Sequence, residues 1–492
     1  MGNTTGNITM RQITHAFIWS PRALIGEELT LQNNILLEVK NNRITKIRQI
    51  SPEELSPSDT NTPHLYILED DITLIPCLKD AHVHMALDGG NFDISPAKGE
   101  KGAECANNKQ EEPNNNEEGK HHKDAKKENA HRNKASEEAL IEENQNGLGY
   151  ERSKDSKQRE KEFFRKNLQD LELFCKQGIG AVRDGGDLQS LNLRLKNFLE
   201  AENLENSDET AARENFGSTE KNGEEYFTPG IVATGQALRR KGKYGSFLGN
   251  GYSTPRELKA ELARLLLAGV DQVKVIVSGV VSFNKYGRVG SPAMSTEELE
   301  HVVSRCHSRG LKVMAHANSQ AAIERAIKAG VDSIEHGYFI TPGLLEAMSA
   351  RQIAWVPTLI PVAAQLREPR VSSLNLQQKN NIDRICREHM DKIAFAAEIG
   401  VPLGIGTDSG APGVKHGSSL FEEMMLYRFA GIAPREILRA ATITNAKIMG
   451  VQDSMGCLQE GNKPCLIGVR GNPIDDFSAL RRLEWFFRAE DD

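Results

Sequence analysis

Two histidines separated by a single residue, His82 and His84, follow an apolar stretch that begins at Leu74. Successive side chains of a β-strand point to opposite faces, so we expect both imidazoles to point the same way. Imidazole nitrogens are common ligands of zinc and similar divalent ions. The pair therefore predicts half of a metal site, and the remaining ligands must come from other parts of the chain.

Further ligand-type residues stand at or near the ends of other apolar runs. They are Lys274, His316, His336 and Asp408. Each one alone is a weak signal, because a single strand-end histidine is more often structural and an aspartate before Ser-Gly usually forms a turn. Four histidines and a carboxylate that converge on one surface would hold zinc or a similar divalent ion. Their order along successive apolar runs predicts such a shared site.

Apolar runs alternate with segments of helical periodicity over most of the chain, as in the helix expected over Arg256–Ala268. The expected strands are Leu74–His84, Gly180–Asp184, Ile231–Thr234, Gln272–Ser278, Lys312–His316, Ser333–His336, Ala354–Thr358 and Leu403–Asp408. This alternation predicts a (β/α)8 TIM barrel, whose active site lies at the C-terminal ends of the strands. A doubly wound sheet is the alternative, and the lack of a Gly-x-Gly-x-x-Gly turn after the first strand disfavours it.

Short strand-like runs flank this central region. Ile35–Val39 and Arg43–Ile47 come before it, and Pro464–Val469 and Leu483–Phe487 come after it. We expect the two ends of the chain to form a small β-sandwich module together. The expected domain bounds are 1–73 and 451–492 for the two parts of the β module and 74–450 for the barrel.

A hydrophilic stretch from about 95 to 160 interrupts the barrel. It is rich in Lys, Glu, Asn, Gly and His and poor in aromatic and β-branched residues. Such a segment cannot bury enough apolar surface to offset the entropy of ordering it, which predicts a disordered or loosely helical insertion. A second polar insertion is expected from about 201 to 225.

Composition narrows the class of protein. The chain has 492 residues and a formal net charge of −7, which argues against a general nucleic-acid binder. Its seven cysteines are widely spaced, and the sequence has no Cys-x-x-Cys motif. This pattern predicts reduced thiols in a cytoplasmic protein. No apolar run approaches the roughly 20 residues of a membrane span. Oligomeric state is left open, with a homo-oligomer as one option.

With these motifs in view, the chain resembles the amidohydrolase superfamily. The resemblance rests on Asp80–His84, Lys274, the two later histidines, Thr407–Asp408 and the tail motif Gly471–Asp476. The strings Val182–Gly186, Lys274–Gly279 and Ile334–Gly337 are most similar to the prolidase-like, binuclear branch. The resemblance implies a metal-dependent hydrolase built on a TIM barrel.

The resemblance also implies roles for the six residues. His82 and His84 would hold the more buried ion, and His316 and His336 would hold the more exposed one. Lys274, carboxylated by carbon dioxide, would bridge two zinc ions, with a single metal ion as the alternative. Desolvation lowers the pKa of a buried lysine, so that its free amine can capture carbon dioxide. Asp408 would bind one ion and act as the catalytic acid and base.

The predicted reaction is hydrolysis of an amide-type C–N bond in a small molecule such as a peptide, an N-acyl amino acid or a cyclic amide. A metal-activated hydroxide would attack the carbonyl carbon while Asp408 transfers the proton to the leaving amine. Loop residues Arg239, Tyr286 and Arg288 are candidates to bind a substrate carboxylate, and ordinary surface charge is the alternative.

Two other functions stay open. One is a mononuclear aminohydrolase or an imidazolonepropionase-type ring-opening hydrolase. Deaminases of the superfamily usually carry a glutamate three residues after the fifth-strand histidine, where this chain has Ser319. The other is a non-catalytic amidohydrolase-like scaffold, which the presence of all the expected ligands disfavours.

Overall fold

The computed structural model describes residues 8–54, 64–87, 154–202, 220–221, 224–225 and 227–489. Residues 1–92 and 161–492 form one compact unit, and residues 93–160 form another. Apart from the start of one helix, the predicted insertion over 95–160 lies outside the described residues, as does most of the stretch from 201 to 225. The first unit contains the described strands and all of the predicted site residues.

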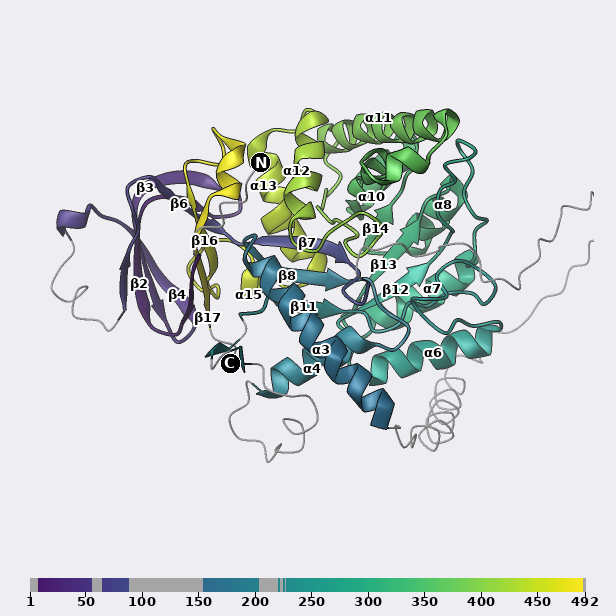
Figure 1. Ribbon diagram of the computed structural model, residues 1–492, viewed down its shortest axis with the longest axis horizontal. Helices are drawn as coiled ribbons and strands as arrows, with labels where there is room; N and C mark the ends of the chain where they lie inside the picture. Colours follow the sequence, from purple (N-terminus) through teal and green to yellow (C-terminus); the bar gives the residue numbers. More distant parts are fainter. Residues whose placement is uncertain are drawn as a thin grey trace, which may run out of the picture. The chain divides into compact units, whose positions relative to one another are not determined.

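Buried parallel strands form the centre of this unit (Figure 1). One sheet has the order β11-β8-β7, and a second has the order β12-β13-β14-β15. The bounds are β7 Leu78–Val83, β8 Ile179–Asp184, β11 Gly230–Ala233, β12 Gln272–Ile276, β13 Lys312–Ala317, β14 Ser333–His336 and β15 Ala354–Val356. All the pairs in both sheets are parallel, which confirms an α/β fold with parallel strands.

Helices follow most of these strands, as the periodicity predicts. They are α3 Lys154–Cys175, α4 Leu191–Glu202, α6 Pro255–Leu267, α7 Thr296–His307, α8 Gln320–Ala329, α9 Pro342–Arg351, α10 Ile360–Ala363, α11 Leu376–Glu398, α12 Ser419–Phe429, α13 Pro434–Arg439, α14 Asn445–Met449 and α15 Gln452–Met455. Local signals set their ends. Thr254 caps α6 by accepting from the backbone N–H of Glu257, and Gly330 ends α8 with a φ of 79°. No helix among the described residues is long and apolar enough to cross a membrane.

The predicted first strand, Leu74–His84, is in fact two strands. β6 (Ile72–Pro76) pairs with β16 of the terminal sheet, whereas β7 starts at Leu78 and pairs with β8. Cys77 lies between them, where the chain passes from one sheet to the other. Because the residues from Leu74 to Leu78 are all apolar and buried, the sequence pattern shows no break at the point where the partner strands change.

The predicted eighth strand, Leu403–Asp408, does not form a regular strand, so that prediction is wrong. The segment still forms backbone hydrogen bonds with β15 on one side and β7 on the other. The backbone N–H of Gly404 donates to Trp355 O of β15 at 2.8 Å, and that of Asp408 donates to His82 O of β7 at 2.7 Å. Gly406 explains the close approach, because a Cβ at that position would lie 2.7 Å from the Cβ of His82.

The N- and C-terminal segments share one mixed eight-stranded sheet, as expected from their strand-like runs. Its order is β1-β17-β16-β6-β2-β3-β4, with β5 paired to β2. The bounds are β1 Thr9–Ile13, β2 Ala16–Ile25, β3 Thr30–Lys40, β4 Arg43–Gln49, β5 Leu65–Ile67, β16 Cys465–Arg470 and β17 Leu483–Ala489. Figure 1 shows the yellow C-terminal strands beside the purple N-terminal ones. Apolar side chains such as Ile18, Leu37 and Phe487 fill the core of this module.

Candidate metal centre

The parallel strands bring the predicted ligands to one edge. His82 and His84 stand at the end of β7, His316 lies in β13 and His336 ends β14. Lys274 lies within β12, two residues before its end. The C-terminal ends of parallel strands share one edge, so residues far apart in the sequence meet there.

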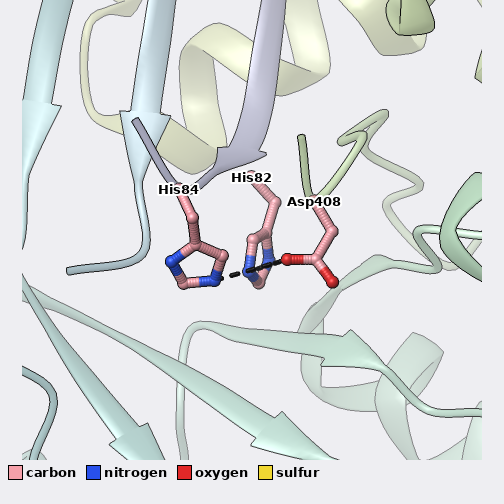
Figure 2. Close-up of side chains that lie close together, drawn as sticks. All are labelled: His82, His84 and Asp408. Atoms are coloured by element: carbon pink, nitrogen blue, oxygen red, sulfur yellow. Dashed lines mark ion pairs between the residues drawn. The ribbon is translucent and has the colours of Figure 1, made fainter. Parts of the chain in front are cut away.

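Distances between the side chains show how close this convergence is. Asp408 Oδ1 lies 3.3 Å from His84 Nε2 and 3.6 Å from His82 Nε2 (Figure 2). Lys274 Nζ lies 3.2 Å from His82 Nε2. The ring centroid of His336 lies 5.0 Å from that of His82 and 4.5 Å from that of His316. The structure therefore brings all six predicted side chains into one cluster.

Asp80 holds the Asp408 segment against β7. Its two carboxylate oxygens accept from the Thr407 backbone N–H at 2.9 Å and from the Thr407 hydroxyl at 2.6 Å. Asp408 itself has a φ of 53°, in the left-handed region that non-glycine residues rarely occupy. The bonds to Thr407 fix the backbone that carries this strained residue.

Burial shapes the charges of the cluster. It lowers the pKa of His84 and of His316 to about 3, with the charge of Lys274 adding to the effect. Burial also lowers the pKa of Lys274 to about 8, against the opposing charges of Glu335 and Asp408. It raises the pKa of Asp408 to about 7, against the opposing charge of Lys274. Neutral imidazoles keep a lone pair for a metal ion, and shifts of this size are typical of functional sites.

Each of the four histidines has one ring nitrogen in contact with a group outside the cluster. The pairs are His82 Nδ1 with Glu335 Oε2 at 2.7 Å, His336 Nδ1 with Thr358 Oγ1 at 2.6 Å, His84 Nδ1 with Gly186 O at 3.3 Å and His316 Nε2 with Gly279 O at 3.3 Å. Such contacts orient the ring and leave the second nitrogen to the site.

This set of donors fits a divalent metal ion. His82, His84 and Asp408 each offer one ligand atom, and these atoms lie within 4.8 Å of one another. Two more neutral imidazoles and a lysine with a lowered pKa adjoin them. Nitrogen and carboxylate donors of this kind suit zinc and related ions.

Two of the three predicted substrate-binding residues, Arg239 and Tyr286, use their polar groups to bond other parts of the protein. Arg239 Nε donates to Gly249 O at 2.7 Å, and its Nη1 donates to Lys243 O at 2.9 Å. These bonds support a role in holding its own loop rather than in binding a substrate. The Tyr286 hydroxyl donates to Glu388 of α11, while Arg288 is exposed.

Sequence reasoning missed several residues that touch the cluster. The ring of Tyr244 stacks on His316 with centroids 5.2 Å apart and an interplanar angle of 30°. Glu335 Oε2 lies 2.7 Å from His82 Nδ1, and Arg183 pairs with Glu335 at 2.9 Å. Glu335 and Arg183 did leave a signal, because each is a charged residue within a short predicted strand. Tyr244 lies in a polar loop, where nothing marks it.

Comparison with known families identifies the class of protein. The sequence model of the amidohydrolase family matches residues 180–487, and the chain belongs to this family. That finding confirms the resemblance drawn from the sequence motifs.

Individual relatives are more distant. An ochratoxinase of Aspergillus niger is 26% identical over 226 residues, which cover 46% of this chain and 46% of that protein. An imidazolonepropionase of Deinococcus deserti is 25% identical over 197 residues, covering 39% of this chain and 41% of that protein. The chain thus matches about half the length of these curated relatives or less.

Solved structures match over nearly the whole chain. A Xaa-Pro dipeptidase with bound methionine has a TM-score of 0.66 at 21% identity, covering 96% of this chain and 98% of that one. The Aspergillus niger ochratoxinase structure has a TM-score of 0.65 at 17% identity, covering 96% and 94%. At such identities the likeness shows a shared fold.

Proposed function

We propose that this protein is a metal-dependent hydrolase that cleaves an amide-type C–N bond in a small-molecule substrate. The observation that carries the proposal is the buried cluster of four histidines, Lys274 and Asp408 at one edge of the parallel strands. Membership of the amidohydrolase family supports it. So do the names of similar proteins, which include a Xaa-Pro dipeptidase, an ochratoxinase and a phenylurea hydrolase.

In this proposal, two zinc ions would bind with a carboxylated Lys274 as their shared ligand. His82 and His84 would hold one ion, and His316 and His336 would hold the other. Complete burial and a pKa of about 8 support the modification, because the neutral amine, and not the ammonium ion, reacts with carbon dioxide. A carboxylated lysine would also place negative charge beside imidazoles that are neutral.

A divalent ion bound here would supply Lewis acidity, which lowers the pKa of water and polarises an amide carbonyl. Asp408 provides the proton transfers. Its carboxylate lies 3.3 Å from His84 Nε2, and burial raises its pKa, which favours a group that accepts a proton and releases it again. In this mechanism Asp408 takes the proton lost by water and passes it to the leaving nitrogen.

The proposed architecture is a closed barrel of the (β/α)8 kind from β7 to residue 450, in which the irregular segment Leu403–Asp408 takes the place of the eighth strand. The proposed β-sandwich is built from residues 1–76 and 451–492, because β6 (Ile72–Pro76) pairs with β16. The segment Leu403–Asp408 hydrogen-bonds to both β15 and β7, which supports closure of the barrel on one side. On the other side, the Leu238 N–H donates to Lys274 O at 2.8 Å, which links the segment after β11 to β12.

A single-ion, imidazolonepropionase-type ring opening is a second candidate, favoured by the match to an imidazolonepropionase. Metal analysis separates the two, because the first requires two ions per chain and the second requires one. Ser319 caps α8 by accepting from the Ala322 N–H, so it does not replace a deaminase glutamate. A cytoplasmic location and a homo-oligomeric state stay predictions.

The test is a hydrolysis screen of the full chain, produced with zinc and bicarbonate, against dipeptides including Xaa-Pro, N-acyl amino acids, cyclic amides and lactones. Asp408→Asn is the matched control, since it keeps the shape of the side chain and removes its basicity. Activity that is lost in the variant supports the proposal. Equal turnover by both proteins would overturn it, and a biological effect retained by the variant would favour a scaffold.

A further inference from the structure

Glu335 lies directly behind the predicted metal ligand His82. Its carboxylate is completely buried, and Oε2 lies 2.7 Å from His82 Nδ1. A buried carboxylate is costly unless it is paired, and Arg183 pairs with it through Nη2 at 2.9 and 3.0 Å from its two oxygens. The hydroxyl of Ser333 donates to Oε1 at 2.5 Å. Arg183 and Ser333 therefore both donate to this carboxylate.

Arg183 in turn joins four strands. It stands on β8, and its Nε donates to Ala81 O of β7 at 2.6 Å. Its Nη1 donates to Gln272 Oε1 of β12 at 3.2 Å and to Ser333 Oγ of β14 at 3.1 Å. A planar guanidinium fixed by so many partners holds the Glu335 carboxylate in one position.

We infer that Glu335, fixed by Arg183, is a positioning residue for His82, an inference that rests on the proposed metal centre. A carboxylate can only accept, so the proton of the neutral His82 ring sits on Nδ1. The lone pair of His82 is then on Nε2, which faces Lys274 and Asp408 at 3.2 and 3.6 Å. The pair thereby sets both the tautomer and the direction of this ligand.

On the side away from the cluster, the other three predicted histidine ligands contact neutral groups. His84 and His316 contact backbone carbonyls, and His336 contacts a hydroxyl. A carboxylate acceptor makes an imidazole a stronger donor of electron density than a neutral acceptor does. Metal affinity should therefore depend more on the partner of His82, Glu335, than on the partners of the other three histidines.

The test measures zinc affinity of the metal-free full chain by competition with a chromophoric chelator. Glu335→Gln should weaken zinc binding by about 10- to 100-fold, the range typical of lost partners behind metal-bound histidines. Glu298→Gln is the matched control. Glu298 is also held by an arginine and a hydroxyl, with Arg240 at 2.8 Å and Tyr252 at 3.2 Å. Zinc affinity of that variant should equal that of the wild type.

Glu335→Gln leaves Arg183 buried without its anion, so the double variant Arg183→Met/Glu335→Gln provides a second test. It removes both charges and should show the same loss of zinc affinity. Wild-type affinity in either folded variant would overturn the inference. Failure of the wild type to bind zinc would instead overturn the proposed function.

A third measurement needs neither Glu335→Gln nor the double variant. Nitrogen-15 spectra of the metal-free wild type, with labelled histidine and His82 assigned by substitution, report which ring nitrogen carries the proton. A single Nδ1–H tautomer for His82 is expected. An Nε2–H tautomer, or averaging between the two, would overturn the inference even if both variants failed to fold.

Discussion

Two arginines show how differently the two regions of this molecule use charge. Arg470, in the terminal β sheet, pairs with Asp71, Glu69 and Glu484, and its side chain is 35% exposed. Arg183, among the parallel strands, is 1% exposed and pairs with Glu335. Water screens the Arg470 ion pairs and does not screen the Arg183 pair. Loss of one partner should therefore destabilise the protein much more at Arg183 than at Arg470.

The cores differ in the same way. The β module buries apolar side chains such as Ile18 and Leu74, and keeps the Arg470 ion pairs near its surface. The edge of the parallel strands buries Lys274, Glu335 and Asp80. Buried charges of this kind are typical of functional sites, which supports the proposed metal centre.

The largest effect is expected at the cluster itself. Asp408→Asn should lower kcat/KM by about 10²- to 10⁴-fold, the range typical of a lost general acid and base. Steady-state kinetics on the substrate found in the screen would measure it. Circular dichroism should show an unchanged fold, and a loss below 10-fold would contradict the assigned role.

The second-largest effect is expected when the buried ion pair between Arg183 and Glu335 is broken. Arg183→Met leaves the Glu335 carboxylate without its counter-ion and should lower the free energy of unfolding by about 3–5 kcal/mol. Urea unfolding of the metal-free protein measures the change. A loss under about 1 kcal/mol would show that this pair behaves like a surface one.

A smaller effect is expected where the irregular segment meets β7. Gly406→Ala would place a methyl group 2.7 Å from the Cβ of His82, and such overpacking typically costs about 1–3 kcal/mol. Gly343→Ala in α9 is the control, because a Cβ there has no neighbour within 4 Å. Thermal unfolding should separate the two, and equal melting temperatures would contradict the close packing.

The smallest effect belongs to the terminal sheet. Arg470→Ala should change the free energy of unfolding by no more than about 1 kcal/mol, because exposed ion pairs contribute little. Zinc affinity should not change. A destabilisation as large as that of Arg183→Met would remove the contrast between the two regions.

Much of the candidate site could be predicted from the sequence because its signals are local. His82 and His84 share a face through strand alternation alone, and the strand-end positions of His316 and His336 follow from short apolar runs. The helix expected over Arg256–Ala268 is α6, Pro255–Leu267, because a cap such as Thr254 starts a helix whatever packs against it. Such features need no knowledge of distant residues.

Other features could not be predicted, because they depend on which distant segments meet. The pattern around Cys77 is apolar throughout, so only the choice of partner strands divides it into β6 and β7. Gly406 lies in a predicted strand, yet its segment is irregular and approaches His82 so closely that a Cβ would not fit. The sequence suggests that Arg239 could bind a substrate carboxylate, yet its guanidinium donates to backbone carbonyls of its own loop.

The sequence by itself determined the family, the alternation of strands with helices and the six side chains that could bind a metal ion, because residue type and short-range periodicity carry that information. Tertiary structure alone decided that Glu335 of β14 stands behind His82 and that Arg183 of β8 holds Glu335 there. Sequence separation hides such pairs, because contact between buried charges is set by the packing of strands that lie far apart in the chain.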